Sequence, residues 1–267
     1  RASRRNPAVI AGPLAGCGVL ITRPAHQSGN LAAAIEAAGG RVVRFPVLQI
    51  VGRDIDDIRQ DLAALPSPDI VIFISSNAVT HGFAALGATT AKLAAIGPAT
   101  RDAIEAMGRT VRLFPERDFD SEHLLQHAAL QELDKQNILI VRGQDGRDLL
   151  ADTLRERGAN VAYVCAYRRE ACAPSAAEVA ALEAELREGS VHFSTVMSVA
   201  TMQELLRILP RRSWPDLRQT VLVAPSARVL QTATALLPGI SSVLAAGPQP
   251  PAIVNALIGQ WQNGHNS

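Results

Sequence analysis

Four loops combine hydroxyl, guanidinium and glycine residues directly after short apolar segments. These loops are Thr22-Arg23-Pro24, Ser75-Ser76-Asn77, Gly97–Thr100 and Arg142–Gly146. A hydroxyl and the free backbone N–H groups at the start of a helix can face an anionic ligand. The same hydroxyls are also ordinary helix caps. The sequence therefore predicts a ligand site in these loops and leaves open how each hydroxyl is used.

The segments before the loops are short and almost wholly apolar, as in residues 69–74 and 92–96. Such runs are typical of strands buried in a parallel sheet. They alternate with helical patterns, for example 54–65, where Ile55, Ile58 and Leu62 have helical spacing. This alternation predicts an α/β fold with parallel sheets. Ligands of such sheets bind beyond the carboxyl ends of the strands.

The second half of the chain repeats the order of the first. The matched pairs are 138–143 with 20–24, 191–198 with 72–76, 220–228 with 93–101, and 249–257 with 120–125. We therefore predict two similar parallel-sheet α/β lobes. Lobe one combines 17–44 with 171–267, lobe two is the continuous middle 48–164, and 1–16 is a flexible N-terminal tail.

Two β-rich runs follow helices that end in glycine. They are Arg41–Ile50 and Val161–Glu170. We interpret them as two extended crossings that form a two-stranded linker, with an open cleft between the lobes. This interpretation predicts that Tyr167 lies at the hinge.

The composition excludes several classes of protein. The 267 residues are 48% hydrophobic and carry a net charge of +1, which argues against a general nucleic-acid binder. No apolar run approaches the ~20 residues of a membrane helix. Three cysteines without a CxxC pair favour neither a disulfide framework nor a zinc site. We predict a cytoplasmic protein with reduced cysteines and no metal.

Two local patterns carry alternatives that we disfavour. The arginine-rich start before Cys17 is similar to a short lipoprotein signal, but Pro7 and Pro13 interrupt its apolar part. His123 and His127 stand four residues apart on a helix predicted to run from 121 to about 133. That spacing can bind a metal, but no third ligand lies nearby in the sequence.

Seven short motifs resemble those of the uroporphyrinogen-III synthases, and they occur in that family's order. They are Ile21-Thr22-Arg23-Pro24, Phe45-Pro46-Val47-Leu48-Gln49-Ile50, Phe73-Ile74-Ser75-Ser76-Asn77-Ala78-Val79, Ile96-Gly97-Pro98-Ala99-Thr100, Pro115 with Ser121-Glu122-His123-Leu124-Leu125, Val141-Arg142-Gly143 with Gly146-Arg147-Asp148-Leu149, and Ala166-Tyr167-Arg168-Arg169. The resemblance covers nearly the whole chain after residue 17.

The resemblance implies a bilobal enzyme that uses no metal or organic cofactor. Members of the family cyclise hydroxymethylbilane with loss of water and inversion of its D ring, giving uroporphyrinogen III. It therefore implies a lyase of tetrapyrrole biosynthesis, which supplies haem, sirohaem, chlorophyll and cobalamin. The implied partners are the linear tetrapyrrole substrate and the upstream enzyme that produces hydroxymethylbilane. Nucleic acid and membrane are not expected as partners, and a monomer is expected.

The resemblance also implies site residues. Tyr167 matches the family's hinge tyrosine, whose phenol could donate to the leaving hydroxyl; a strand tyrosine that only packs is the alternative. The substrate carries many carboxylates, which arginine binds in bidentate fashion. The implied substrate-binding residues are Arg23, Ser75, Ser76, Thr100, Arg101, Arg142, Arg147, Thr195 and Ser226, with Arg228 as a further candidate.

The chain departs from the family at two turns. Ser194-Thr195-Val196-Met197 and Ala224-Pro225-Ser226-Ala227 replace a Ser-Pro-Ser-like turn and a Gly-x-Thr-Thr turn. They keep open the alternative of a degenerate synthase domain. A non-catalytic bilobal ligand-binding module is a second alternative, because such proteins also have two α/β lobes and crossing linkers.

Overall fold

The computed structural model describes residues 12–117, 119–144 and 148–265, and they form two compact units. Unit 1 combines the described residues up to Gln49 with those from Ala171 onward. Unit 2 is the continuous middle, Ile50–Glu170. The chain passes between the units at 49–50 and 170–171, a few residues from the boundaries that the sequence predicts.

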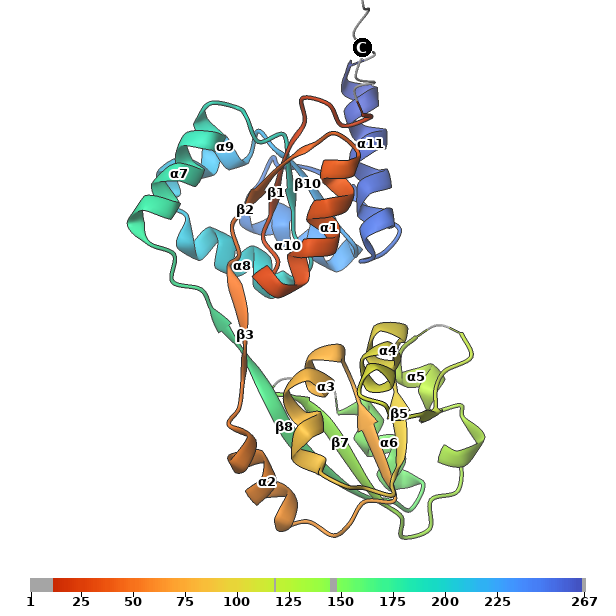
Figure 1. Cartoon of the computed structure of the whole chain (residues 1–267). Coiled ribbons are helices and arrows are strands. Elements are labelled where there is room, and N and C mark those ends of the chain that lie inside the picture. The colour runs from red at the N-terminus through yellow and green to blue at the C-terminus, as the bar shows by residue number, and fades with distance from the viewer. Residues whose placement is uncertain (1–11, 118, 145–147, 266–267) are drawn as a thin grey trace, which may run out of the picture. The chain divides into compact units, whose positions relative to one another are not determined.

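Unit 1 is built on a five-stranded sheet with the order β11-β10-β9-β1-β2 and parallel pairing throughout. Its strands are β1 (Gly18–Ile21), β2 (Arg41–Arg44), β9 (Phe193–Thr195), β10 (Val221–Ala224) and β11 (Ser241–Leu244). Helices α1 (Ala25–Ala37) and α11 (Pro250–His265) lie side by side (Figure 1) and share one core. Helices α7 (Ala176–Arg187), α8 (Val199–Ile208), α9 (Trp214–Leu217) and α10 (Ala227–Leu236) contribute to a second core.

Unit 2 is built on a six-stranded sheet with the order β3-β8-β7-β4-β5-β6. Its strands are β3 (Leu48–Gly52), β4 (Ile70–Phe73), β5 (Lys92–Ala95), β6 (Val111–Leu113), β7 (Asn137–Gly143) and β8 (Asn160–Ala171). Its helices are α2 (Ile55–Ala63), α3 (Ser76–Gly82), α4 (Pro98–Ala106), α5 (Ser121–Leu124) and α6 (Leu149–Glu156), with 3₁₀ turns at Phe83–Leu86 and Ala128–Leu130. Alternate strand residues enter two separate apolar cores, as buried parallel strands require.

The five strands of unit 1 have the same order as five of the six strands of unit 2. Reading β2-β1-β9-β10-β11 in unit 1 gives the counterpart of β8-β7-β4-β5-β6 in unit 2. In each unit one strand leads through one helix to the parallel strand beside it, as β1-α1-β2 and β7-α6-β8. The α/β fold with parallel sheets that the sequence predicted is therefore confirmed. Three of the four matched pairs of segments occupy matched strands, and the fourth pair, 249–257 with 120–125, lies at the helices α11 and α5.

One predicted crossing is not a single strand. Residues 41–50 divide into β2, which pairs with β1, and β3, which lies next to β8. Pro46 stands at the break and has no N–H for a sheet hydrogen bond, while Phe45 and Val47 are buried in the core of unit 1. The return segment, in contrast, is the continuous twelve-residue strand β8.

The predicted helix from 121 to about 133 is also wrong, because the chain there forms only α5 and a separate 3₁₀ turn. His127 adopts an extended conformation (ψ 132°), and its Nδ1 accepts the Ala129 N–H. His123 pairs with Asp120 at 2.6 Å, and hydrogen bonds from the His123 backbone and side chain lower the pKa of that carboxyl. Among the described residues, no group of three His, Cys, Asp or Glu side chains is placed to hold a metal ion.

The three cysteines are not joined in disulfides. Cys17 is fully buried, and its burial raises the pKa of the thiol to about 12.

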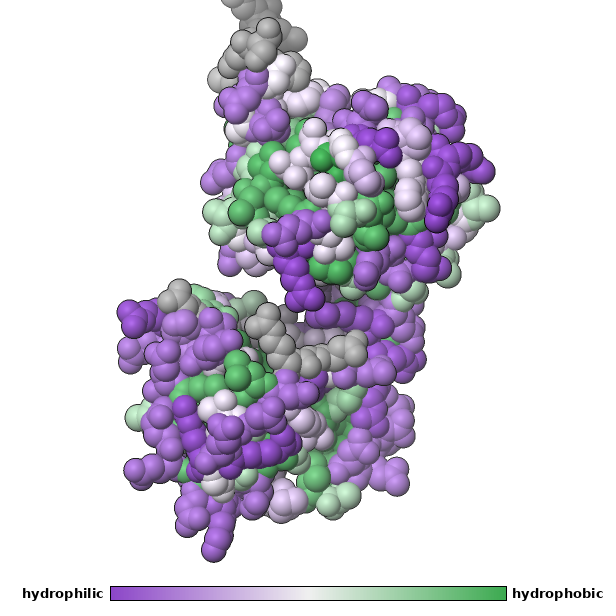
Figure 2. Space-filling view, turned by 180° about the vertical axis from the view of Figure 1, so that it is seen from behind, coloured by the Kyte–Doolittle hydropathy of each residue, from purple (hydrophilic) through white to green (hydrophobic). Residues whose placement is uncertain are grey.

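Figure 2 shows mainly hydrophilic side chains over the visible exterior of each unit, with smaller apolar areas among them. Within the described part of the chain, no helix has the length and apolar character needed to cross a membrane.

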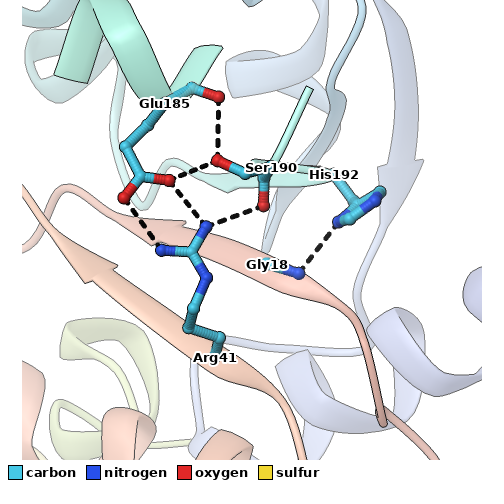
Figure 3. Close-up of polar contacts among 5 residues, drawn as sticks. All are labelled: Gly18, Arg41, Glu185, Ser190 and His192. Carbon is cyan, nitrogen blue, oxygen red and sulfur yellow. Dashed lines mark hydrogen bonds and ion pairs between the residues drawn. The ribbon is translucent and has the colours of Figure 1, made fainter. Parts of the chain in front are cut away.

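A polar cluster joins the amino-terminal edge of the sheet in unit 1 to the end of α7 (Figure 3). The guanidinium of Arg41 donates to both carboxylate oxygens of Glu185, at 3.0 and 2.7 Å, and to the Ser190 carbonyl at 2.9 Å. The hydroxyl of Ser190 donates back to Glu185, and the N–H of Gly18 donates to Nδ1 of His192. Hydrogen bonds to the carboxylate lower the pKa of Glu185. Those from Arg41 have the larger effect and that from Ser190 the smaller.

Replacing Glu185 with glutamine is expected to destabilise unit 1 more at neutral pH than in acid. Because the folded-state pKa lies below the unfolded value of about 4.3, the ionised Glu185 stabilises the fold above that pH. The contribution disappears as the pH falls through the folded-state pKa. Thermal melts should show Glu185→Gln about 1–3 °C below the wild type at pH 7, and a smaller difference in acid, below the folded-state pKa. An equally large difference in acid would contradict this assignment; Glu36→Gln, at an exposed pair with Arg44, is the control.

Candidate active site

The carboxyl ends of β4, β5 and β7 meet at one edge of unit 2 because these strands are adjacent and parallel. Ser75 follows β4 and begins α3, and Gly97 follows β5 and begins α4. Arg142 and Gly143 end β7. The structure therefore brings three of the four predicted loops together at a single edge of one sheet.

Tyr167 lies on β8 beside this edge and is only 4% exposed. The hydroxyl of Tyr167 is 3.1 Å from Oγ of Ser75, and the ring lies 6.2 Å from that of His81 between centroids. The hinge position stays a prediction; the residue belongs to unit 2 and packs in that unit's core. Its hydroxyl nevertheless reaches the predicted loop after β4.

Ser75 has two roles that its single hydroxyl satisfies together. Its Oγ accepts the Ala78 N–H at 3.1 Å and so caps α3. A hydroxyl has one proton and two acceptor positions. If Ser75 gives its proton to Tyr167, the phenol proton of Tyr167 remains available for another acceptor. The pair can therefore supply one proton outward and stabilise the phenolate that remains.

Gly143 allows the Tyr167 ring to occupy this position. A Cβ atom on Gly143 would lie 2.8 Å from Cζ and 2.9 Å from Cε2 of the ring. The pairing of β7 with β8 also shifts between Arg142 and Gly143, which places Gly143 opposite Tyr167. The Gln144 N–H then donates to the Tyr167 carbonyl at 2.9 Å. The glycine and the irregular pairing thus set the direction of the phenol.

Three other predicted residues lie in the same loops. Ser76 is in the first turn of α3, where its carbonyl accepts from Thr80. Thr100 is in the first turn of α4; the residue is 5% exposed, and its hydroxyl makes no hydrogen bond to another described residue. Arg101 is held by an ion pair with Asp102 at 3.1 Å and covers the ring of Phe114 at 4.7 Å.

Arg142 points to the opposite face of the sheet from Tyr167, among residues that line a small cavity. Its guanidinium covers the Tyr163 ring at 4.7 Å and pairs with Asp148 at 3.2 Å. Tyr163 also donates to Asp148, at 3.2 Å. Burial, and then this carboxylate, raise the pKa of Tyr163. Arg147, the remaining predicted arginine of this loop, lies outside the described residues.

The predicted residues of unit 1 have different environments. Arg23 follows β1, is partly buried with a pKa lowered by desolvation, and has no hydrogen bond or ion pair to another described residue. Thr195 is fully buried, and its hydroxyl donates to the Leu20 carbonyl at 2.9 Å. Ser226 is exposed at the start of α10 without a side-chain cap bond, and Arg228 is exposed in the first turn of that helix. None of these contacts tests a substrate role, so each remains a prediction.

Sequence reasoning assigned no role in the site to Gly143, Asp148 or Tyr163. If the register of the two strands had been predicted, Ile140 would have paired with Tyr163. Because Ile140 and Arg142 are two residues apart on one strand, Tyr163 would then lie on the same face of the sheet as Arg142. The shifted pairing at Gly143 has no counterpart in the residue pattern.

Two solved structures share the fold of this chain. A mutant uroporphyrinogen III synthase from Thermus thermophilus is 19% identical, with a TM-score of 0.58 over 92% of this chain and 99% of that one. The uroporphyrinogen-III synthetase of Helicobacter pylori 26695 is 13% identical, with a TM-score of 0.63 over 91% of this chain and 99% of that one. At these identities the similarity establishes the fold alone.

Sequence comparison is more specific. Residues 29–255 match the family described as Uroporphyrinogen-III synthase HemD. The uroporphyrinogen-III synthase of Escherichia coli K12 is 30% identical over 200 residues, which are 72% of this chain and 80% of that protein. The synthase of Synechococcus elongatus is 30% identical over 207 residues, 74% and 76% of the two chains. The chain belongs to the uroporphyrinogen-III synthase family.

Proposed function

We propose that this chain is a cyclising hydro-lyase that converts hydroxymethylbilane into uroporphyrinogen III with inversion of the D ring. Family membership supports the reaction. The observation that supports a catalytic part for unit 2 is the bond of 3.1 Å between the hydroxyls of Tyr167 and Ser75, at the edge where α/β sheets bind ligands. A nearly buried phenol with a second hydroxyl behind it is suited to general-acid catalysis.

The first step is the departure of the substrate's hydroxyl. Tyr167 donates its proton to that oxygen, the carbon–oxygen bond breaks, and water leaves. The remaining carbon is an azafulvene cation that the pyrrole nitrogen stabilises. Ser75 donates to the phenolate oxygen of Tyr167, which lowers the free energy of the charged state.

The later steps depend on holding one conformation of the substrate. The terminal pyrrole attacks the cation through its substituted carbon, and a new carbon–carbon bond gives a spiro intermediate. The older bond at that carbon then breaks, and the inverted ring recloses through its unsubstituted carbon. Loss of one ring proton restores aromaticity, so the overall change is the loss of one water.

Arginine and hydroxyl residues at the strand ends are proposed to bind the substrate's carboxylates. Arg23 suits this role because its partly buried guanidinium has no partner among the described residues. In unit 2, Thr100 is proposed to bind a carboxylate of the substrate, because its hydroxyl lies in the first turn of α4 and has no hydrogen bond to another described residue. Arg101 is a weaker candidate because Asp102 and Phe114 already engage its guanidinium.

We further propose that the enzyme works as a cytoplasmic monomer. Its substrate partner would be the linear tetrapyrrole, received from the enzyme that produces it. These proposals rest on the sequence patterns and on the family resemblance.

An isomer assay tests the proposed function. The full chain is supplied with hydroxymethylbilane, the products are oxidised, and the type I and type III uroporphyrins are separated by chromatography. We expect type III to predominate. Only type I, formed at the rate of the enzyme-free solution, would refute the synthase activity and favour a ligand-binding module or a degenerate domain.

A further inference from the structure

A cavity of about 260 Å³ opens at the carboxyl edge of the sheet in unit 2, on the face opposite Tyr167. Its apolar walls are Ile74, Ile96, Ile140 and Leu150. Pockets for whole ligands usually measure about 300–1,000 Å³. This cavity is therefore suited to one ring of a larger ligand rather than to a complete tetrapyrrole.

The two charged partners at the cavity, Arg142 and Asp148, differ in how deeply they are buried. Arg142 is a nearly buried cation, because only 11% of its side chain is exposed. Its partner Asp148 is 67% exposed. Water can satisfy this exposed carboxylate when it leaves Arg142 and the Tyr163 hydroxyl, whereas the guanidinium is held on the ring of Tyr163 at 4.7 Å. The guanidinium of Arg142 therefore stays in place, and another carboxylate can replace that of Asp148.

We infer that this cavity binds one carboxylate-bearing pyrrole ring of the substrate, and that Asp148 occupies the place of the substrate's carboxylate until the substrate arrives. This inference rests on the proposed function and deepens it. The pyrrole would lie against the isoleucines and the Tyr163 ring. Its carboxylate would replace Asp148 at the guanidinium of Arg142.

The acidic groups at the rim fit the other end of such a ring. Asp120 and Glu122 also line the cavity, and Asp120 is engaged by the backbone and side chain of His123. A pyrrole carries an N–H donor as well as carboxylates, so a carboxylate oxygen at the rim can accept that N–H. A simple anion has no such donor, and the acidic rim would disfavour it.

The inference predicts opposite effects for the two partners of one ion pair. Asp148→Asn keeps the size of the side chain but removes the competing charge, so KM should fall about two- to fivefold with kcat unchanged. Arg142→Gln removes the cation and should raise KM about 10- to 100-fold. Initial rates of type III formation give both constants.

Asp152→Asn is the matched control. Asp152 lies on helix α6, close to Asp148 in the chain, is 61% exposed and pairs with Arg155, but it does not line the cavity. Removing its charge changes the net charge by the same amount and should leave KM unaltered. A KM that is unchanged or higher in Asp148→Asn, or a fall of equal size in Asp152→Asn, would overturn the inference.

A binding measurement separates this inference from the proposed activity. Calorimetric titration with a monopyrrole carrying two carboxylate side chains should show tighter binding to Asp148→Asn than to the wild type. Asp152→Asn should bind it as the wild type does. Equal binding by all three proteins would refute the subsite even if the wild type makes type III, and absence of type III with the expected binding order would refute only the activity.

Discussion

Replacing Tyr167 with phenylalanine is expected to lower kcat about 100-fold or more while changing KM little. The substitution removes the phenol proton but keeps the ring that packs against Gly143. General-acid catalysis contributes about 10²–10⁴-fold to a rate. Because Ser75 still caps α3 through Ala78, the loss of folding stability should be about 1 kcal/mol. Initial rates and thermal melts of the same preparation measure both effects.

Two companion variants show whether a slow rate comes from the phenol. Thr80→Val removes another hydroxyl from α3, one that donates to the Ser76 carbonyl, and should leave kcat unchanged. Ser75→Asp keeps an acceptor that can cap the helix but has no proton to donate, so it should lower kcat with α3 intact. A wild-type rate in Tyr167→Phe would remove this residue from the chemistry and leave it as a packing residue.

Replacing Gly143 with alanine is expected to reduce both activity and stability, although one methyl group is added. The new Cβ would lie 2.8 Å from Cζ of Tyr167, so the ring or the end of β7 must move. Overpacking of this kind costs about 1–3 kcal/mol. Misplacement of a catalytic group by about 1 Å can lower a rate about 100-fold. The free energy of unfolding, measured in denaturant, and kcat should therefore fall together.

Gly29→Ala provides the contrast. Gly29 lies in α1, and a Cβ there would meet no atom within 4 Å. Alanine should stabilise the helix by up to about 1 kcal/mol. Activity that survives in Gly143→Ala would show that the ring can be displaced without loss of function, contrary to the proposed role of Tyr167.

The order of apolar segments and helical patterns was sufficient to predict the α/β class and the matched segments. Those properties depend on local periodicity and on the rule that parallel strands need helical connections. The same local information misjudged 41–50 and 121–133. In the first, Pro46 separates two strands. In the second, α5 ends at Leu124, and His127 caps a separate 3₁₀ turn.

The site was only partly predictable for a related reason. Neighbouring residues encode strand ends and helix caps, so the loops that carry hydroxyls and guanidinium groups were predictable. The contact of Tyr167 with Ser75, which is 92 residues away, arises only in the folded chain, as do the contacts of Arg142 with Asp148 and Tyr163 on the other side of the sheet. Those contacts depend on strand order and on the shifted pairing at Gly143, and no short stretch of sequence encodes either.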